Sequence, residues 1–186
     1  MGNEHGRAAA IAVMTPIKPR EIGLLRANFW VMDNVEPVTR TLRELRLIHF
    51  ARWSIIEKLP FNGPPQEPER LHYKYLFFQS NFNGSWHDYI DAFSYLLPVR
   101  MRGVWGSSFG FPGAKPVTGF KDYIYRNEYV ASHYYSAYPE ATARTIVSAL
   151  ELARKFEEFD SGVDGMDPEQ FASAYHEFLT RVQRQL

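Results

Sequence analysis

The chain of 186 residues contains no cysteine, and this absence removes several kinds of site at once. Disulfide bonds, thiolate nucleophiles, iron–sulfur clusters and cysteine-ligated zinc all require the missing side chain. The six histidines do not replace it, because none of them belongs to a closely spaced metal-binding pair of the HExxH type. The sequence therefore predicts no metal site, and it identifies no cofactor.

An excess of either charge is also absent, since 21 Lys and Arg residues balance 21 Asp and Glu residues. Nucleic-acid-binding modules usually carry a clear basic excess, so we expect no nucleic-acid partner. No apolar run approaches the roughly 18 residues of a membrane-spanning helix. The apolar stretch Ala8–Met14 is too short for a signal-peptide core. We expect a cytoplasmic protein without a membrane span.

Aromatic residues are abundant, at 16% of the chain, and the segment 73–97 (YKYLFFQSNFNGSWHDYIDAFSYLL) is rich in them. The alternation of side chains predicts a strand over Tyr73–Phe82, followed by a turn at Asn83-Gly84. Ser85 is a good N-cap, and an acidic residue three positions later completes the capping-box pattern. A helix is therefore expected directly after the turn.

Hydrophobic periodicity predicts the other elements. Further strands are expected over Ala8–Met14, Leu45–Glu57 and Tyr129–Tyr138. Helices are expected over Arg20–Arg43 with an interruption and a second short helix at Pro37, over Lys121–Asn127, from Pro139 to about Phe159, and over Asp167–Leu186. The proline-rich Leu59–Pro68 is a connection, and the glycine-rich Arg100–Phe120 is expected to be irregular.

This order, β-α-β-β-α-β followed by two helices, is typical of an α+β ferredoxin-like fold, an antiparallel sheet with helices on one face. We expect a domain over residues 1–160 and a C-terminal helical extension over 161–186. The strands Leu45–Glu57 and Tyr73–Phe82 carry large apolar residues on both faces, so the second face also needs a cover. We expect a homodimer that pairs sheet against sheet as a dimeric α/β barrel; the alternative cover is the C-terminal helices.

Polar and aromatic side chains near the strand-to-helix junction favour a ligand pocket between sheet and helices. A neutral histidine at a helix start can act as a base, and amides in an aromatic wall can orient a ligand or close a hydrogen-bond network. An arginine in a covered strand needs an anion or an acidic partner such as Glu57 or Asp91. The candidates are His49 and His87 as catalytic residues, and Arg52, Trp53, Gln79, Asn81, Arg102 and Trp105 as ligand contacts.

The segment Pro98–Gly113 brings together arginines, aromatic residues and flexible glycines. It fits a lid with cationic and aromatic contacts for a carboxylated apolar ligand. It fits equally well a surface loop whose aromatic residues pack on a partner subunit. Both alternatives stay open at the level of sequence.

Three phrases, QSNFNGSW, SFGFP and YYSAYPEAT, resemble those of a group of bacterial proteins without an established activity, over roughly Ala8 to Phe159. The layout is more distantly similar to the dimeric α/β-barrel proteins, which include small monooxygenases and haem proteins. The first functional hypothesis is binding, and oxidation, of a hydrophobic or aromatic small molecule. The alternatives are a non-enzymatic interaction or structural subunit, and haem binding through His49, His87 or His133. Whether the protein is an enzyme stays open.

Overall fold

The computed structural model describes residues 3–34 and 45–185, which form two compact units, Met1–Glu140 and Ala141–Leu186. Each unit is described by itself. The domain boundary expected after residue 160 falls inside helix α6 (Ala143–Gly162). The short helix predicted around Pro37 lies outside the described residues.

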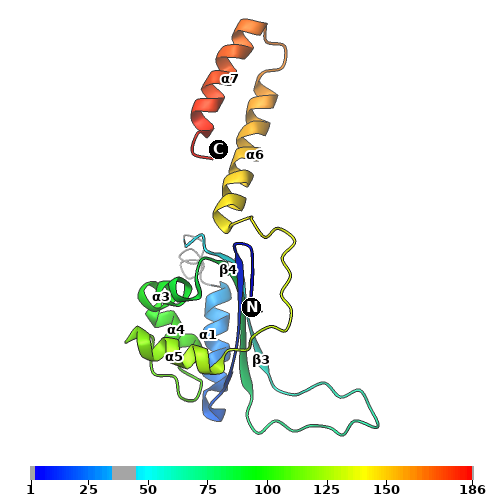
Figure 1. Cartoon of the computed structure of the whole chain (residues 1–186), viewed down its shortest axis with the longest axis vertical. Helices are drawn as coiled ribbons and strands as arrows, with labels where there is room; N and C mark the ends of the chain where they lie inside the picture. The colour runs from blue at the N-terminus through cyan, green and yellow to red at the C-terminus, as the bar shows by residue number, and fades with distance from the viewer. Residues whose placement is uncertain (1–2, 35–44, 186) are drawn as a thin grey trace. The chain divides into compact units, whose positions relative to one another are not determined.

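The first unit contains a four-stranded antiparallel sheet with the strand order β1-β2-β4-β3 (Figure 1). Its strands are β1 (Glu4–His5), β2 (Ala8–Pro16), β3 (Ile48–Ile56) and β4 (Tyr75–Asn83). Since β4 pairs antiparallel with both β2 and β3, the latter two run parallel on either side of it. The three strands predicted over the first half of the chain are thereby confirmed, together with the α+β class.

The strand predicted at Tyr129–Tyr138 is wrong. One bridge joins Glu128 to Val13, and the Tyr129 N–H donates to the Ala12 carbonyl at 2.8 Å; beyond this point the chain is irregular. The physical reason is competition for an edge, because β1 already pairs with the beginning of β2. The displaced segment instead binds the N-terminal hairpin, where the Ala131 N–H donates to Asn3 Oδ1 and the Arg7 N–H to the Pro139 carbonyl.

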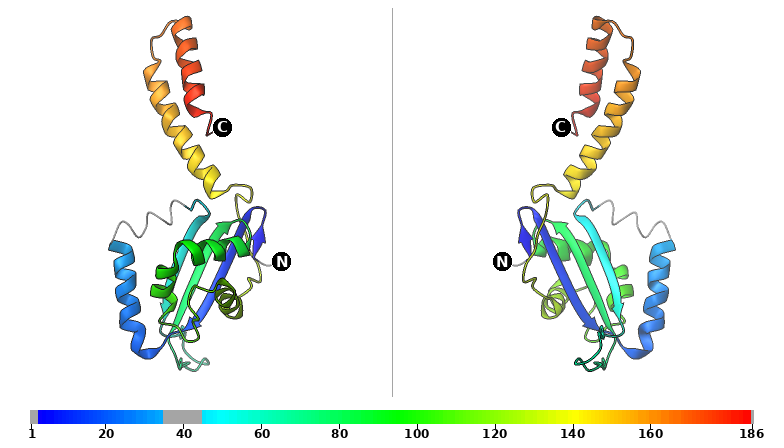
Figure 2. Two further views of the ribbon diagram at one scale, coloured as in Figure 1. Left: turned by 90° about the vertical axis from the view of Figure 1, so that its left-hand side faces the viewer. Right: turned by 90° about the vertical axis from the view of Figure 1, so that its right-hand side faces the viewer.

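Four helices cover one face of the sheet (Figures 1 and 2). They are α1 (Ile22–Asn34), α3 (Trp86–Leu96), α4 (Pro98–Trp105) and α5 (Val117–Asn127). Helix α3 begins as predicted, since the Ser85 hydroxyl accepts a hydrogen bond from the Asp88 N–H at 3.1 Å. The first helix, Ile22–Asn34, lies within the range Arg20–Arg43 that was expected to contain it.

The prediction that Arg100–Phe120 is irregular was wrong at both ends, because α4 and the first turn of α5 fall within it; the residues between the two helices are irregular as predicted. Pro98 occupies the start of α4, where a missing N–H has no cost. A glycine such as Gly103 costs a helix roughly 1 kcal/mol relative to alanine. Burial of Met101, Val104 and Trp105 outweighs that cost. The Leu59–Pro68 connection is confirmed as non-helical.

The core lies between the sheet and these helices. Alternate strand residues, such as Ile11, Val13, Leu76 and Phe78, are buried there against the helices. The Phe82 and Tyr89 rings stack with centroids 3.9 Å apart. The space left among these side chains is a cavity of about 10 Å³, so the interior is filled by the chain itself.

The opposite face of the sheet is open to the viewer in the right-hand panel of Figure 2. The register places Phe77, Gln79 and Asn81 of β4 on it, beside Phe50 and Arg52 of β3. Strict alternation predicts the faces of β4 and of β3 from Phe50 onward, but it was wrong for Ile48, because the register shift between Ile48 and Phe50 pairs Ile48 with Phe82 of the helix-covered face. All described helices of the first unit lie on the other side, and Phe50 is 57% exposed. The sheet-to-sheet dimer stays a prediction.

The second unit is an antiparallel hairpin of α6 and α7 (Pro168–Val182), and both helices were predicted from periodicity. Helix α6 begins after the Thr142 N-cap, rather than at Pro139. The Asp167 carboxylate caps α7 in a capping box with Gln170. None of the helices within 3–34 and 45–185 is long and apolar enough to cross a membrane.

Candidate functional site

The structure separates the eight candidate residues into several places. Arg52, Gln79 and Asn81 lie on the open face of the sheet. There the Arg52 guanidinium donates to Gln79 Oε1, and Asn81 Nδ2 donates to the Tyr134 hydroxyl at 2.8 Å. These amides therefore close hydrogen bonds within the chain.

The acidic partner predicted for Arg52 was wrong. Glu57 pairs with Arg26 and Lys74, and Asp91 pairs with Lys121 at 2.7 Å. The prediction rested on burial of Arg52, but this residue is exposed. A solvated guanidinium needs no carboxylate, so a neutral amide is a sufficient partner.

Trp53 and Trp105 lie on the helix-covered side of the sheet and belong to the core. Their rings contact Phe78 at centroid distances of 5.1 and 5.2 Å, and Trp105 is only 2% exposed. Trp105, but not Trp53, lines the cavity of about 10 Å³, which is at the lower limit for a single water molecule. The two tryptophans fill the core instead of walling a ligand pocket.

The histidines are also apart from any shared pocket. His49 lies where the β3 register shifts between Ile48 and Phe50, and its Nε2 atom is buried without a hydrogen-bond partner among the described residues. His87 is exposed in the first turn of α3, where its ring contacts Trp86. His133 is exposed in the irregular segment after α5. Across 3–34 and 45–185, no group of three or more His, Asp or Glu side chains is placed to hold a metal ion.

The remaining candidate, Arg102, lines a groove of about 560 Å³ beside α4. Two further cations, Lys18 and Lys115, line the same groove. The other lining residues are apolar or glycine: Pro98, Val99, Gly106, Phe111, Pro112, Gly113 and Ala114. Three positive charges therefore face one groove in which the described lining has no acidic side chain.

Buried hydroxyl groups hold the loop that forms one wall of the groove. The Ser94 hydroxyl donates to the Ala114 carbonyl, and the Ser108 and Thr15 hydroxyls bond at 2.9 Å. Lys18 ties the same loop to the end of β2, because its N–H donates to the Ser107 carbonyl at 2.9 Å. The loop predicted as a lid is thus anchored to the core, so the groove is formed without closure of a lid.

The second interpretation of this loop was that its aromatic residues pack on a partner subunit, and the contacts of Phe111 do not support it. The Phe111 ring meets Phe120 and Tyr123 edge-on, at centroid distances of 6.0 and 5.7 Å. Both partners belong to α5 of the same chain, so Phe111 packs on its own subunit. Its remaining exposed part is available to the groove.

Two of the cations also contact neighbouring groups of the chain. Lys18 Nζ donates to the Gly106 carbonyl at 3.0 Å, and Lys115 Nζ lies 5.4 Å from the centroid of the Tyr95 ring. Neither contact neutralises the charge. A carboxylate or other anion that enters the groove gains charge-assisted hydrogen bonds, and Val99 and Phe111 offer apolar contact to the rest of the ligand.

The sequence indicated only part of this groove. Arg102 and the loop after Pro98 were identified, but Lys18 and Lys115 were missed. Each of these lysines is next to a proline, Lys18-Pro19 and Lys115-Pro116, which indicates a loop but no ligand. Only the tertiary structure brings Lys18 to Arg102.

Comparison of the chain with protein-family models, with curated proteins and with solved structures finds no match. The resemblance expected from the three sequence phrases therefore stays a prediction. The functional argument depends on the groove itself.

Proposed function

We propose that this protein binds a small anionic molecule with an apolar portion in the groove beside α4. The observation that carries the proposal is the convergence of Lys18, Arg102 and Lys115 on apolar walls without a lining acid. Uncompensated cations on a concave, partly apolar surface are the usual receptor for a carboxylate. The ligand class agrees with the carboxylated apolar molecule expected from the Pro98–Gly113 segment.

The proposal concerns binding. The groove lining, in the part of the chain that the structure describes, offers no imidazole, carboxylate or hydroxyl group as a base. His49 and His87 line neither this groove nor the filled interior. Oxidation of the bound molecule and binding of haem stay predictions of the sequence, to be tested by native mass spectrometry of the purified protein for retained mass.

The binding experiment uses a pair of ligands that differ in charge. Isothermal titration calorimetry is carried out with 2-naphthoate and with its neutral analogue 2-naphthamide. The carboxylate is expected to bind at least tenfold more tightly, because one charge-assisted hydrogen bond contributes about 1.5–3 kcal/mol and roughly 1.4 kcal/mol is a factor of ten. Arg102→Gln is expected to remove most of this preference.

Arg126→Gln is the matched control, because Arg126 is an exposed arginine of α5 that does not line the groove. It makes the same change in net charge, so it is expected to leave naphthoate binding unchanged. Equal affinity for the two ligands would contradict the proposal. So would an equal effect of the two substitutions, since the attraction would then come from net charge alone.

For the fold, we propose that the first unit is a ferredoxin-like variant in which β1 takes the edge position that Tyr129–Tyr138 was expected to fill. The split order of β2, β4 and β3 supports this assignment. A sheet-to-sheet dimer of this variant would desolvate Arg52, which donates a hydrogen bond to the neutral Gln79, on a face whose β2, β3 and β4 residues include no acid. This cost makes another surface a better candidate for contact with a second copy.

A further inference from the structure

The α6–α7 hairpin buries little apolar surface of its own. Among the described residues of Ala141–Leu186, the apolar side chains that are buried are Ala143 and Val182. Units below about 70–80 residues rarely obtain more than 3–5 kcal/mol from one core, and many gain the rest by oligomerisation. A further apolar contact would therefore add to the stability of the hairpin.

Helix α6 is apolar on two sides. One side faces α7, where the Phe159 and Phe178 rings stack at 4.8 Å and Lys155 Nζ donates to Gln185 Oε1 at 3.1 Å. The other side carries Ile146, Val147 and Leu150, which are 41%, 40% and 67% exposed. At about 100° per residue, Leu150 lies nearly opposite Phe159 on the helix. These three residues are here called the outer stripe.

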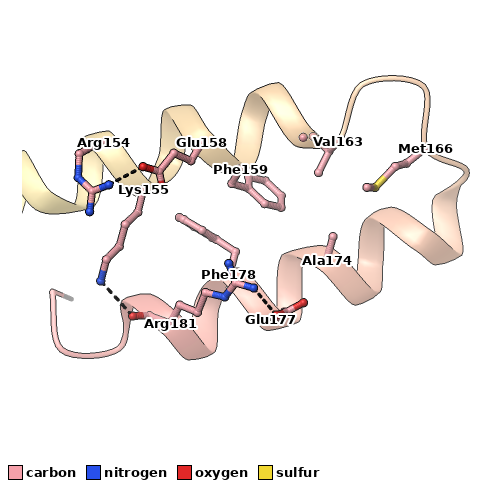
Figure 3. A pocket seen from close by; sticks show the side chains of 11 residues that line it. Arg154, Lys155, Glu158, Phe159, Val163, Met166, Ala174, Glu177, Phe178 and Arg181 are labelled. Atoms are coloured by element: carbon pink, nitrogen blue, oxygen red, sulfur yellow. Dashed lines mark hydrogen bonds and ion pairs between the residues drawn. The ribbon is translucent and has the colours of Figure 1, made fainter.

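A groove also lies between the two helices of the hairpin (Figure 3). It has a volume of about 410 Å³, and Phe159, Val163, Met166 and Phe178 line it. Its rim carries the ion pairs Arg154–Glu158 and Arg181–Glu177, each within one helix. Val147, Arg154 and Glu158 are spaced i, i+7 and i+11, so the rim of the groove continues the line of Val147 along α6, whereas Phe159 lines the groove from the side opposite Leu150. An apolar centre with a polar rim is typical of a protein interface.

The charges of the hairpin identify the partner that fits this surface. The end at the turn is acidic, since residues 157–169 contain six acids and no base in the sequence EEFDSGVDGMDPE. The opposite end is basic, with Arg144 near the start of α6 and Arg184 after α7, and residues 141–150 and 178–185 contain no acid. A second hairpin in antiparallel orientation would place each acidic end beside a basic end.

We propose that two copies of this chain associate through their α6–α7 hairpins as an antiparallel four-helix bundle, with Ile146, Val147 and Leu150 in its core. The arrangement is isologous, so the same stripe is buried from both copies. Four helices are the common bundle in which a helix with two apolar sides buries both of them. The acidic and basic ends set the antiparallel orientation.

Sedimentation velocity of the full chain between 1 and 100 µM tests the proposal with one matched pair of variants. The wild-type chain is expected to be a dimer, and Leu150→Glu is expected to weaken dimerisation at least a hundredfold, because it buries two unpaired carboxylates. Phe50→Glu makes the same kind of change on the open face of the sheet and is expected to leave the dimer intact. A monomeric wild type overturns the proposal. Dissociation by Phe50→Glu with an intact Leu150→Glu dimer also overturns it, and assigns the contact to the sheet.

Exchanging the charges at the two ends of the hairpin distinguishes loss of the antiparallel orientation from loss of folding. Arg144→Glu with Arg184→Glu is expected to weaken the dimer about tenfold or more. Addition of Asp160→Lys and Asp164→Lys to the same chain is expected to restore it, because the ends are again complementary. Failure of the restoration, with an unchanged helical circular dichroism signal, would overturn the antiparallel arrangement.

Discussion

Among single residues, Glu128 shows how position decides what a carboxyl group does. Its two oxygens accept hydrogen bonds from Trp86 Nε1 at 2.8 Å and Asn3 Nδ2 at 3.3 Å. Burial raises its pKa above the ordinary value of 4.5, although the two hydrogen bonds act in the opposite direction. Both oxygens have partners within the chain, so this carboxyl group connects the N-terminus, α3 and the end of α5.

The raised pKa predicts how stability depends on pH. Below about pH 4.5 the carboxyl group is protonated in both states, so the contribution of its raised pKa is fully present. As the pH rises, the unfolded state loses this proton first, and that contribution is lost. We expect the free energy of unfolding of the wild type, minus that of Glu128→Gln, to be smaller at pH 7 than at pH 4. Urea unfolding at both pH values measures this difference.

The other shifted carboxyl group, Glu57, is exposed and is present in both proteins, so it cancels in that comparison. Its pKa is lowered, first by the hydrogen bond from Lys74. A difference that stays constant, or that increases with pH, would contradict the role assigned to burial of Glu128.

At the level of elements, the N-terminal hairpin shows how a neighbouring segment restricts a turn. Gly6 and Gly84 both have positive φ, +62° and +96°. A Cβ atom on Gly6 would lie 2.7 Å from the Pro139 carbonyl oxygen, whereas a Cβ on Gly84 would meet no heavy atom within 4 Å. The segment that fails to become a strand is therefore packed closely against the β1–β2 turn.

Substitution of the two glycines by alanine separates backbone strain from this contact. Both variants bear the cost of a left-handed alanine, roughly 1–2 kcal/mol. Gly6→Ala is expected to lose about 1–3 kcal/mol more, because the added methyl group must displace backbone. Thermal or urea unfolding of the two variants provides the comparison. Equal destabilisation would mean that the Pro139 contact does not restrain the turn.

At the level of the whole molecule, the chain consists of two units with different internal packing. The first has a continuous core of apolar side chains from sheet and helices, in which Leu76 is fully buried. The second has a few partly exposed rings, such as Phe159 and Phe178, between two helices. This difference in packing predicts that a substitution in the core of the first unit destabilises the first unit and changes the stability of the second unit little.

Leu76→Ala is expected to destabilise the first unit by about 2–5 kcal/mol, because it leaves a cavity in the closely packed interior. Hydrogen exchange is expected to become faster at the slowest amides of β2 and β4, and to change little in α6 and α7. Tyr129→Ala is a control in the irregular segment, where the side chain is exposed. Equal acceleration in both units would show that they unfold as one.

Local chemistry explains which elements could be predicted. The Asn83-Gly84 turn, the Ser85 cap and the alternation in Tyr75–Asn83 depend on residues close together in sequence, and all three occur in the structure. Tyr129–Tyr138 has the composition of a strand, but a strand also needs an edge to pair with, and β1 pairs with the beginning of β2 at Ala8 and Ala9. Helix α4 was missed because burial of Met101 and Trp105, which compensates for Gly103, depends on tertiary contacts.

The candidate site also divides into features that depend on local sequence and features that depend on tertiary contacts. Sequence alone determined the charged loop after Pro98 and the amphipathic character of the C-terminal helices, since these depend on residue type and local spacing; the class of ligand stays a prediction. Only the tertiary structure decided that Trp105 fills the core, that Gln79 binds Arg52, and that Lys18 joins Arg102 in one groove. The physical reason is that burial and charge convergence depend on contacts between distant segments, and residue type and spacing do not specify which segments meet.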